Sequence, residues 1–398
     1  MPVELRSSSA LSNRLSAPSH RFLITGGGGY VGQSLAQVLA ARGDSVSLAD
    51  LRFSSDDSKF KRVQVDVAKL KDVDRAVSAG YDCVFHVASF GMSGGEMLKK
   101  DKIYAVNVVG TRNVIAACQK HGVKALVYTS TYNVVFGGQE IRNGDETLPY
   151  LPMDRHVDAY SRTKSEAEQL VLSANSNSGL LTCALRLAGV YGPGEQRHLP
   201  RAVGFMAVGA FRVRWGLRQA DVDFLHIDNL VQGHVKAADR LLLGDRRVAG
   251  RAFFLSDGAP TPNFDFFAKL AGGLGYPTPC LAAPYHAVYG LAWLAELAHS
   301  VANRLGLEFE PWLTRAEVCK TGVTHYFSVA AAADALGYQP TVSNDLTECV
   351  TWFRLRGWGR PTAARPARGS ARCLRLLLSL AFALCLCALL ASMLPGVA

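Results

Sequence analysis

Two residues that could transfer a proton, Tyr160 and Lys164, lie four positions apart in this 398-residue chain. If the stretch is helical, the phenol and the ammonium share one face, about one turn apart. A nearby cation favours phenolate and should lower the tyrosine pKa from about 10 toward that of a general base at neutral pH. The same spacing is common on solvent-facing helices, so its meaning depends on the elements that would position the two residues.

A glycine-rich turn lies upstream of this pair. Residues 21–25 form an apolar run that predicts a strand, and Gly26, Gly29 and Gly32 follow in G-x-x-G-x-x-G spacing at the start of a predicted helix. Glycine allows a tight turn and a close approach of phosphates, and a helix N-terminus offers free N–H groups. Strand, turn and helix in this order predict a dinucleotide site rather than a merely flexible loop.

Acidic residues end the next two predicted strands. Asp50 comes about twenty residues after the glycine turn, where a carboxylate can bind the adenosine ribose hydroxyls and would repel a 2′-phosphate. This favours NAD, although Arg52 close by keeps NADP open. Asp66 is placed to meet the adenine amino group, and the alternative is a cap for the following helix.

Two later strands should end at the ligand-binding edge of the sheet. Residues 83–89 form a buried apolar run, and residues 125–131 end in hydroxyls that include Ser130 and Thr131. Open α/β sheets bind ligands at the carboxyl ends of their strands. Hydroxyls often end strands, so what matters is that Thr131 precedes Tyr160 by 29 residues.

As a set, these motifs resemble the extended short-chain dehydrogenases/reductases and occur in that family's order over residues 20–350. Three later stretches, at 131–138, 223–234 and 252–258, are similar to the 3-beta-hydroxysteroid dehydrogenase and sterol-4-alpha-carboxylate dehydrogenase group, and most of all to its family 42E members. The motifs are Thr25-Gly26-x-x-Gly29-x-x-Gly32, Asp50, Asp66-Val67, His86-Val87-Ala88-Ser89, Asn107-Val108-Val109-Gly110-Thr111, Tyr128-Thr129-Ser130-Thr131, Tyr160-x-x-x-Lys164 and Arg186-x-x-x-x-Tyr191-Gly192-Pro193.

The resemblance implies roles for the matched residues. Tyr160 would be the general acid or base, and Lys164 would lower its pKa and hold the nicotinamide ribose. Thr131 would orient the substrate oxygen, with Ser130 as the alternative, and Asn107 would support a water-linked proton relay. The implied cofactor contacts are Gly26, Gly29, Tyr30, Gly32, Asp50, Asp66, Val67 and Lys164.

The predicted fold is α/β, a Rossmann-type doubly wound parallel sheet with a smaller C-terminal substrate lobe and a single C-terminal transmembrane helix. Residues 280–306 are apolar and aromatic but interrupted, which predicts a helix that covers the pocket or lies at an interface and suits a flat apolar ligand. The expected divisions are a disordered tail at 1–19, a dehydrogenase domain at 20–358 with its lobe mainly at 192–350, a basic linker at 359–375 and an anchor at 376–394.

The anchor prediction rests on a run without charges. Residues 376–394 are long enough to cross a bilayer, on the short side, which suits the endoplasmic reticulum membrane. Arginines precede the run and four residues follow it, so the catalytic domain should face the cytosol in a tail-anchored protein. For the N-terminal tail, a mitochondrial transit peptide is the alternative to simple disorder.

Charge and cysteine content indicate which kinds of partner this protein could bind. The net charge is +10, and five arginines crowd in the linker before the apolar run, which favours a membrane surface. No basic stripe is interleaved with aromatics, so nucleic-acid binding is not favoured. Nine scattered cysteines, without a C-x-x-C pair or metal-like spacing, predict a reducing compartment and no metal site. A homodimer is possible.

Our hypothesis is an NAD-dependent oxidoreductase that oxidises a secondary alcohol of a steroid or sterol at a membrane face. Three alternatives stay open: a decarboxylating sterol-carboxylate dehydrogenase, a nucleotide-sugar epimerase or dehydratase, and a non-catalytic membrane-tethered NAD(H) sensor.

Overall fold

A computed structural model describes most of the predicted dehydrogenase domain. The predicted anchor at 376–394, nearly all of the basic linker and the tail up to residue 18 lie outside the described residues. Among the helices that are described, none combines the length and apolar character needed to cross a bilayer. The described residues are 19–53, 59–92, 94–176, 179–216, 219–307, 309 and 311–359.

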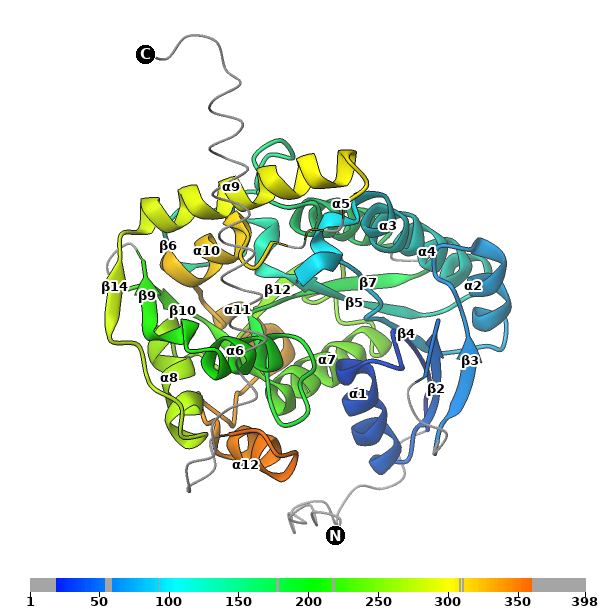
Figure 1. Cartoon of the computed structure of the whole chain (residues 1–398). Helices are drawn as coiled ribbons and strands as arrows, with labels where there is room; N and C mark the ends of the chain where they lie inside the picture. Colours follow the sequence, from blue (N-terminus) through cyan, green and yellow to red (C-terminus); the bar gives the residue numbers. More distant parts are fainter. Residues whose placement is uncertain are drawn as a thin grey trace.

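Seven parallel strands form the large sheet, in the order β12-β7-β5-β4-β1-β2-β3 (Figure 1). The strand order reverses beside β1, and open α/β sheets bind ligands at such a reversal. The strands are β1 (Arg21–Thr25), β2 (Ser45–Asp50), β3 (Lys61–Gln64), β4 (Cys83–His86), β5 (Ala125–Thr131), β7 (Leu181–Leu187) and β12 (Arg251–Leu255).

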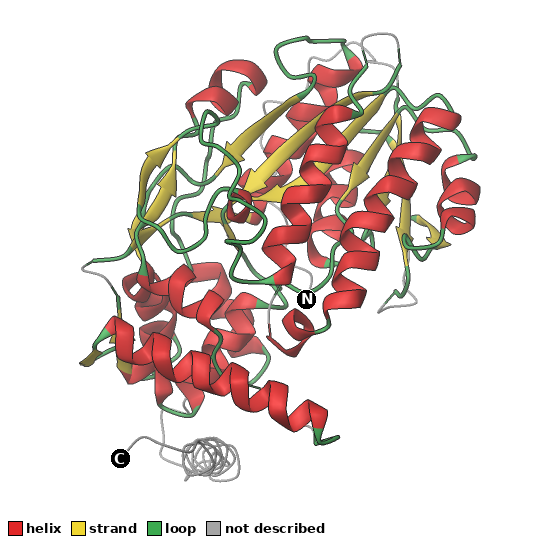
Figure 2. Cartoon of the chain, turned by 90° about the horizontal axis from the view of Figure 1, so that it is seen from above, coloured by secondary structure: helices red, strands yellow, loops and turns green. Residues whose placement is uncertain are grey.

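Helices cover both faces of this sheet, and Figure 2 shows the strands running between helical layers. Val127 of β5 shares one buried core with Leu39 and Leu241, whereas its neighbour Leu126 shares the opposite core with Val171. Successive side chains of β5 therefore pack into hydrophobic cores on opposite faces of the sheet, which confirms the doubly wound prediction. The first face carries α1 (Tyr30–Ala41), α7 (Ile227–Leu242) and α11 (Ala330–Leu336), and the second carries α2 (Leu70–Val77), α4 (Gly110–Lys120) and α5 (Ala159–Ser173).

The rest of the described chain forms a smaller lobe with short strands. They pair in a four-stranded sheet, β13-β10-β15-β6, and in two pairs, β11-β8 and β14-β9. The strands are β6 (Ile141–Gly144), β8 (Gly189–Tyr191), β9 (Val213–Trp215), β10 (Asp221–Val222), β11 (Phe224–His226), β13 (Thr261–Pro262), β14 (Leu281–Ala283) and β15 (His325–Phe327). The helices are α6 (His198–Ala207), α8 (Asn263–Gly273), α9 (Tyr285–Arg304), α10 (Arg315–Gly322) and α12 (Thr347–Leu355).

The smaller lobe and the large sheet are not built from two separate stretches of the chain. Within residues 192–350, α7, β12 and α11 return to the large sheet, while β6, which precedes that range, pairs with β15 of the lobe. Short helices at Gly94–Leu98, Lys100–Tyr104 (α3), Tyr132–Val134 and Ala210–Arg212 connect the larger elements, and Ala105–Val109 forms a π-helical turn between α3 and α4.

Helix α9 confirms the helix predicted over residues 280–306. Its inner face buries small residues such as Ala292 and Ala295, while Leu291, Trp293 and Leu297 on other faces are 45%, 47% and 37% exposed. In Figure 1 the helix lies along one side of the lobe. An apolar helix that leaves large side chains in contact with water is typical of an interface.

Candidate active site

Helix α5 positions the predicted proton-transfer pair. Its N-cap, Asp158, accepts a hydrogen bond from the Ser161 N–H at 2.6 Å, which fixes the first turn around Tyr160. Tyr160 is 4% and Lys164 2% exposed, so both side chains lie on the inner face of the helix. The solvent-facing alternative for this pair is therefore excluded.

The smaller lobe reaches this helix through one ion pair. Lys320 of α10 donates from Nζ to Asp158 Oδ2 at 3.1 Å, and their side chains are 20% and 7% exposed. Burial would raise the pKa of Asp158, but Lys320 and the hydrogen bonds from Ser161 outweigh it, and the pKa is lowered. The carboxylate at the start of α5 is thus held ionised by a residue 162 positions away.

Lys164 extends from α5 toward β5. Its Nζ donates to the Thr129 carbonyl at 2.5 Å and lies 4.0 Å from the centre of the Tyr128 ring. Burial lowers the pKa of Lys164 to about 7, against the opposing charge of Glu168. The ammonium and the neutral amine are therefore close in free energy at neutral pH.

The expected lowering of the Tyr160 pKa is wrong for this structure. Burial raises the pKa of the phenol above its usual range, more than Arg197 and a hydrogen bond with Ser89 lower it. Arg197 and Ser89, not Lys164, are the groups that lower it, and the Lys164 ammonium donates to the Thr129 carbonyl. Helical spacing places the two residues on one face, but burial decides the phenol's protonation.

The two candidate hydroxyls at the end of β5, Ser130 and Thr131, have different hydrogen-bond partners. Ser130 Oγ donates to Glu168 Oε2 at 2.5 Å and points to the α5 side of the sheet. Thr131, 7% exposed, accepts only a long hydrogen bond, 3.3 Å, from the Asn133 N–H among the contacts of the described residues. Since Ser130 is committed to a buried carboxylate, Thr131 is the hydroxyl available for a substrate oxygen.

Asn107 lies in the π-helical turn, and its amide is fully used. It accepts from the Phe90 N–H at 2.8 Å and donates to the Phe90 carbonyl and to Thr163 Oγ1, both at 3.0 Å. These bonds hold the loop after β4 against α5. The proton-relay role stays a prediction, and the side-chain contacts are those of a positioning residue.

The glycine turn has the close approaches that its sequence predicts. Gly26 has φ +72°, and a Cβ there would lie 2.8 Å from the Ala88 nitrogen. A Cβ on Gly32 would lie 2.5 Å from the Gly26 carbonyl oxygen. Gly29 is the N-cap of α1 and provides no side-chain cap, so the first N–H groups of the helix receive no side-chain acceptor. This is an anion-binding geometry.

Asp50 lies directly beside this turn. Its Oδ2 accepts from the Gly28 N–H at 2.9 Å and its Oδ1 from the Arg52 N–H at 3.2 Å. Two carboxylate oxygens have further lone pairs, so the side chain can still accept from ribose hydroxyls. The Tyr30 hydroxyl instead points toward Gly192, where a Cβ would lie 2.4 Å from it. Of Tyr30, the backbone is the part that lies at the helix N-terminus.

Asp66 and Val67 lie at the adjoining edge. Asp66 Oδ1 accepts from the Ala68 N–H at 3.1 Å, so it closes a turn, whereas the residue that caps α2 is Lys69. Val67 is 8% exposed and packs against Gly110 of α4. Both lie where β3 leads into α2, on the β1–β2–β3 side of the sheet that would face an adenosine.

One buried polar network was missed in the sequence. Glu168 of α5 is 0% exposed and binds Arg186 of β7 at 2.8 Å and the Tyr150 hydroxyl at 2.7 Å. The sequence contains one signal for this network. Glu168 follows Lys164 by four residues, so the spacing places an acid on the inner face of the same amphipathic helix.

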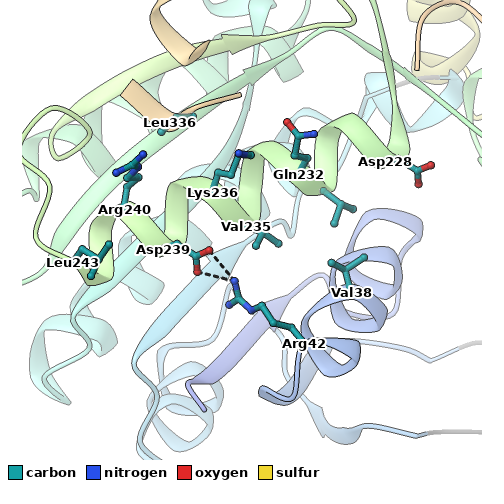
Figure 3. A pocket seen from close by; sticks show the side chains of 11 residues that line it. Val38, Arg42, Asp228, Gln232, Val235, Lys236, Asp239, Arg240, Leu243 and Leu336 are labelled. Carbon is teal, nitrogen blue, oxygen red and sulfur yellow. Dashed lines mark hydrogen bonds and ion pairs between the residues drawn. The ribbon is translucent and has the colours of Figure 1, made fainter. Parts of the chain in front are cut away.

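A surface groove lies elsewhere on the molecule, between α1 and α7 (Figure 3). It has a volume of ≈ 560 Å³ and is crossed by Arg42, whose Nη1 is 2.8 Å from both carboxylate oxygens of Asp239. Its lining contains none of the predicted site residues. It is therefore separate from the site around Tyr160.

The sequence of this chain is similar to a known protein family and to several of its members. The model of the 3-beta hydroxysteroid dehydrogenase/isomerase family matches residues 23–282. The chain is 49% identical over 385 residues to short-chain dehydrogenase/reductase family 42E member 1 of Danio rerio, covering 94% of this chain and 97% of that protein. It is 34% identical to a 3-beta-hydroxysteroid dehydrogenase of Mycolicibacterium neoaurum (84% and 91%) and 33% identical to a decarboxylating sterol-4-alpha-carboxylate 3-dehydrogenase of Mus musculus (81% and 87%).

Solved structures share the fold. A short-chain dehydrogenase/reductase superfamily protein from Agrobacterium tumefaciens, with bound NAD, aligns with a TM-score of 0.63 and 22% identity over 85% of this chain and 98% of that one. MoeE5 in complex with UDP-glucose and NAD aligns with a TM-score of 0.63 and 20% identity over 84% and 99%. At these identities the likeness concerns the fold alone.

Proposed function

Because this chain belongs to the 3-beta hydroxysteroid dehydrogenase/isomerase family, we propose that it is an NAD-dependent oxidoreductase acting on a secondary alcohol of a steroid or sterol. The observation that carries the proposal is that α5 buries Tyr160 and Lys164 beside the end of β5, where Thr131 offers a hydroxyl. A phenol, an ammonium and a hydroxyl at a sheet edge are the groups that alcohol oxidation requires.

The cofactor would be held by the glycine turn, by the N-terminus of α1 and by Asp50, which favours NAD over a 2′-phosphorylated cofactor. These residues fit a dinucleotide because the turn is too tight for a Cβ at Gly26 or Gly32, which would meet the backbone of Ala88 or of Gly26, and because the first N–H groups of α1 receive no side-chain acceptor. When bound, NAD supplies the hydride acceptor and a positive charge.

The chain's own residues would handle the proton. Thr131 would hydrogen-bond the substrate oxygen and orient it toward Tyr160, whose Oη would take the hydroxyl proton. Lys164 as the ammonium would favour the phenolate form of Tyr160, which must be present before Tyr160 can take that proton. Because burial raises the pKa of Tyr160, the side chain would need such a cation beside it to take up a proton near neutral pH.

The surroundings support an apolar substrate. Tyr132 follows Thr131 directly and joins the core cluster of Val135 and Phe136, against which Tyr285 and Tyr289 of α9 pack. Such an aromatic wall suits a flat ring system better than a nucleotide sugar. Two relatives, the bacterial 3-beta-hydroxysteroid dehydrogenase and the mouse sterol-4-alpha-carboxylate 3-dehydrogenase, support the same substrate class by their names.

The test is a mass-spectrometric screen of steroid and sterol alcohols with the purified full chain and NAD or NADP. We expect one or more alcohols to be oxidised to ketones, faster with NAD. Release of labelled carbon dioxide from a sterol carboxylate would favour the decarboxylating reaction. Turnover of a nucleotide sugar alone would overturn the proposal, as would cofactor binding without turnover of any alcohol.

A pair of variants tests which hydroxyl of β5 acts on the substrate. We expect Thr131→Ala to lower kcat by about 10²-fold, because the substrate oxygen loses its orienting donor. Ser130→Ala should instead lower the melting temperature, because the buried Glu168 carboxylate loses a hydrogen bond, while kcat changes less. Thermal unfolding and steady-state kinetics on both variants separate the effects, and the reverse ranking would exchange the two roles.

We also propose that residues 376–394 anchor the protein in the endoplasmic reticulum membrane with the catalytic domain in the cytosol. The support is the uncharged run, the arginines before it and the exposed leucines of α9. The Leu380→Arg/Leu384→Arg double variant places two charges in the run, at about 3 kcal/mol each. It should move from the carbonate-resistant membrane pellet to the supernatant, whereas Leu355→Arg, on an exposed position of α12, should stay in the pellet.

A further inference from the structure

Glu168 is a buried acid on α5, one turn beyond Lys164, and every contact with its carboxylate is a donor. Arg186 donates from Nε at 3.0 Å and from Nη2 at 2.8 Å. The hydroxyls of Tyr150 and Ser130 donate at 2.7 and 2.5 Å. A carboxylate that receives a guanidinium and two hydroxyls is fixed in place.

These donors come from the elements that surround the active site. Ser130 precedes Thr131 on β5, and Arg186 of β7 lies opposite Ser130 in the parallel register. Tyr150 lies in the segment that leads from β6 into α5. One carboxylate therefore connects the helix that carries Lys164 to the strand end that carries the substrate-orienting hydroxyl.

Apart from Glu168 and its partner Arg186, the titratable groups around Lys164 are uncharged at neutral pH. Burial, with the charge of Lys164, lowers the pKa of His86 on β4 to about 3. Burial raises the pKa of Tyr128 on β5 and of Tyr160 on α5 above their usual values. Within the described part of the chain, Glu168 is the charge that acts on Lys164.

We infer that Glu168 is a positioning residue for the active site, whose negative charge raises the fraction of Lys164 in the ammonium form. Burial alone favours the neutral amine, and an opposite charge at the next turn of the helix favours the cation. The hydrogen bonds from Ser130 and Arg186 hold that charge in place. The catalytic consequence rests on the proposed function, but the charge of Lys164 can be measured without turnover.

Glu168→Gln keeps the size of the side chain and removes its charge. In the full chain labelled with 15N-lysine, the titration of the Lys164 Nζ resonance, assigned with Lys164→Met, should shift down by about 1 pH unit. The ratio of wild-type to variant kcat/KM should then grow from near one at about pH 5.5 to about fivefold at pH 7, since one unit changes the ammonium fraction that much. A purely structural role would give a loss independent of pH.

Tyr150→Phe is the matched control. It removes a hydrogen bond to the same carboxylate but leaves the charge, so the melting temperature should fall while Lys164 titrates as in the wild type. If Glu168→Gln does not fold, the Glu168→Gln/Arg186→Met double variant removes both charges of the buried pair, a change that proteins often tolerate. A smaller downward shift of the Lys164 titration is expected there, because removing Arg186 also removes a cation.

An unchanged Lys164 titration in the variant that lacks the Glu168 charge would overturn the inference. So would an equal shift in Tyr150→Phe. A shifted titration together with a failed substrate screen would refute the proposed function and leave this inference standing.

Discussion

Tyr160→Phe should reduce alcohol oxidation by about 10²–10⁴-fold, the range that general acid–base catalysis contributes. The change removes one hydroxyl from a ring that is 4% exposed, so packing around α5 is kept. The glycine turn and Asp50 are untouched, and the affinity for NAD should stay close to that of the wild type. Stopped-flow turnover and calorimetric NAD binding on the same preparation measure the two effects.

Tyr338→Phe serves as the control for losing a buried phenol hydroxyl. Tyr338 is 1% exposed and donates to the Ser256 carbonyl at 2.8 Å, so its loss should cost about 1 kcal/mol of stability without changing kcat. Turnover of Tyr160→Phe at the wild-type rate would show that another group takes the proton.

Gly26→Ala should abolish measurable NAD binding and turnover. An L-residue in the left-handed region costs about 1–2 kcal/mol, and here the new Cβ would also lie 2.8 Å from the Ala88 nitrogen. The turn must therefore shift, and with it the N–H groups at the start of α1 that would receive the pyrophosphate. Isothermal titration with NAD and thermal unfolding give both quantities.

Gly122→Ala separates backbone strain from the steric clash. Gly122 has φ +66°, close to that of Gly26, but a Cβ there meets nothing within 4 Å. This variant should lose a similar stability and bind NAD like the wild type. Equal loss of NAD binding in both variants would mean that strain, not the approach of Ala88, governs the site.

Local sequence signals were enough for the elements of the large sheet. The strands at 21–25 and 125–131 begin and end as predicted. The first ends at the glycine run, and the second ends where the short helix Tyr132–Val134 begins. Strand β4 ends at His86, shorter than predicted. Its chain turns away where the Ala88 N–H donates to the Thr25 hydroxyl instead of a strand carbonyl.

The smaller lobe could not be predicted in detail. Its strands are two to four residues long and pair with distant partners, as β6 does with β15 and β9 with β14. Such short segments carry no readable periodicity, and their pairing depends on which surfaces meet after the large sheet has formed.

In the site, residue identities were easier to predict than their electrostatics. Helical spacing placed Tyr160 and Lys164 on one buried face, but the direction of the Tyr160 pKa depends on burial, which spacing does not reveal. Glu168 and Arg186 are about 18 residues apart and meet only because α5 packs across β7. Their pairing required the tertiary structure.

The ion pair between Lys320 and Asp158 limits how this protein could be re-engineered. Asp158 caps the helix that carries Tyr160, and its cationic partner comes from the smaller lobe. A chimera that imports a relative's substrate lobe must also supply a cation at that position, or a buried carboxylate is left unpaired. If the proposed roles of the smaller lobe and of Tyr160 hold, substrate range and proton transfer could not be exchanged independently in this chain.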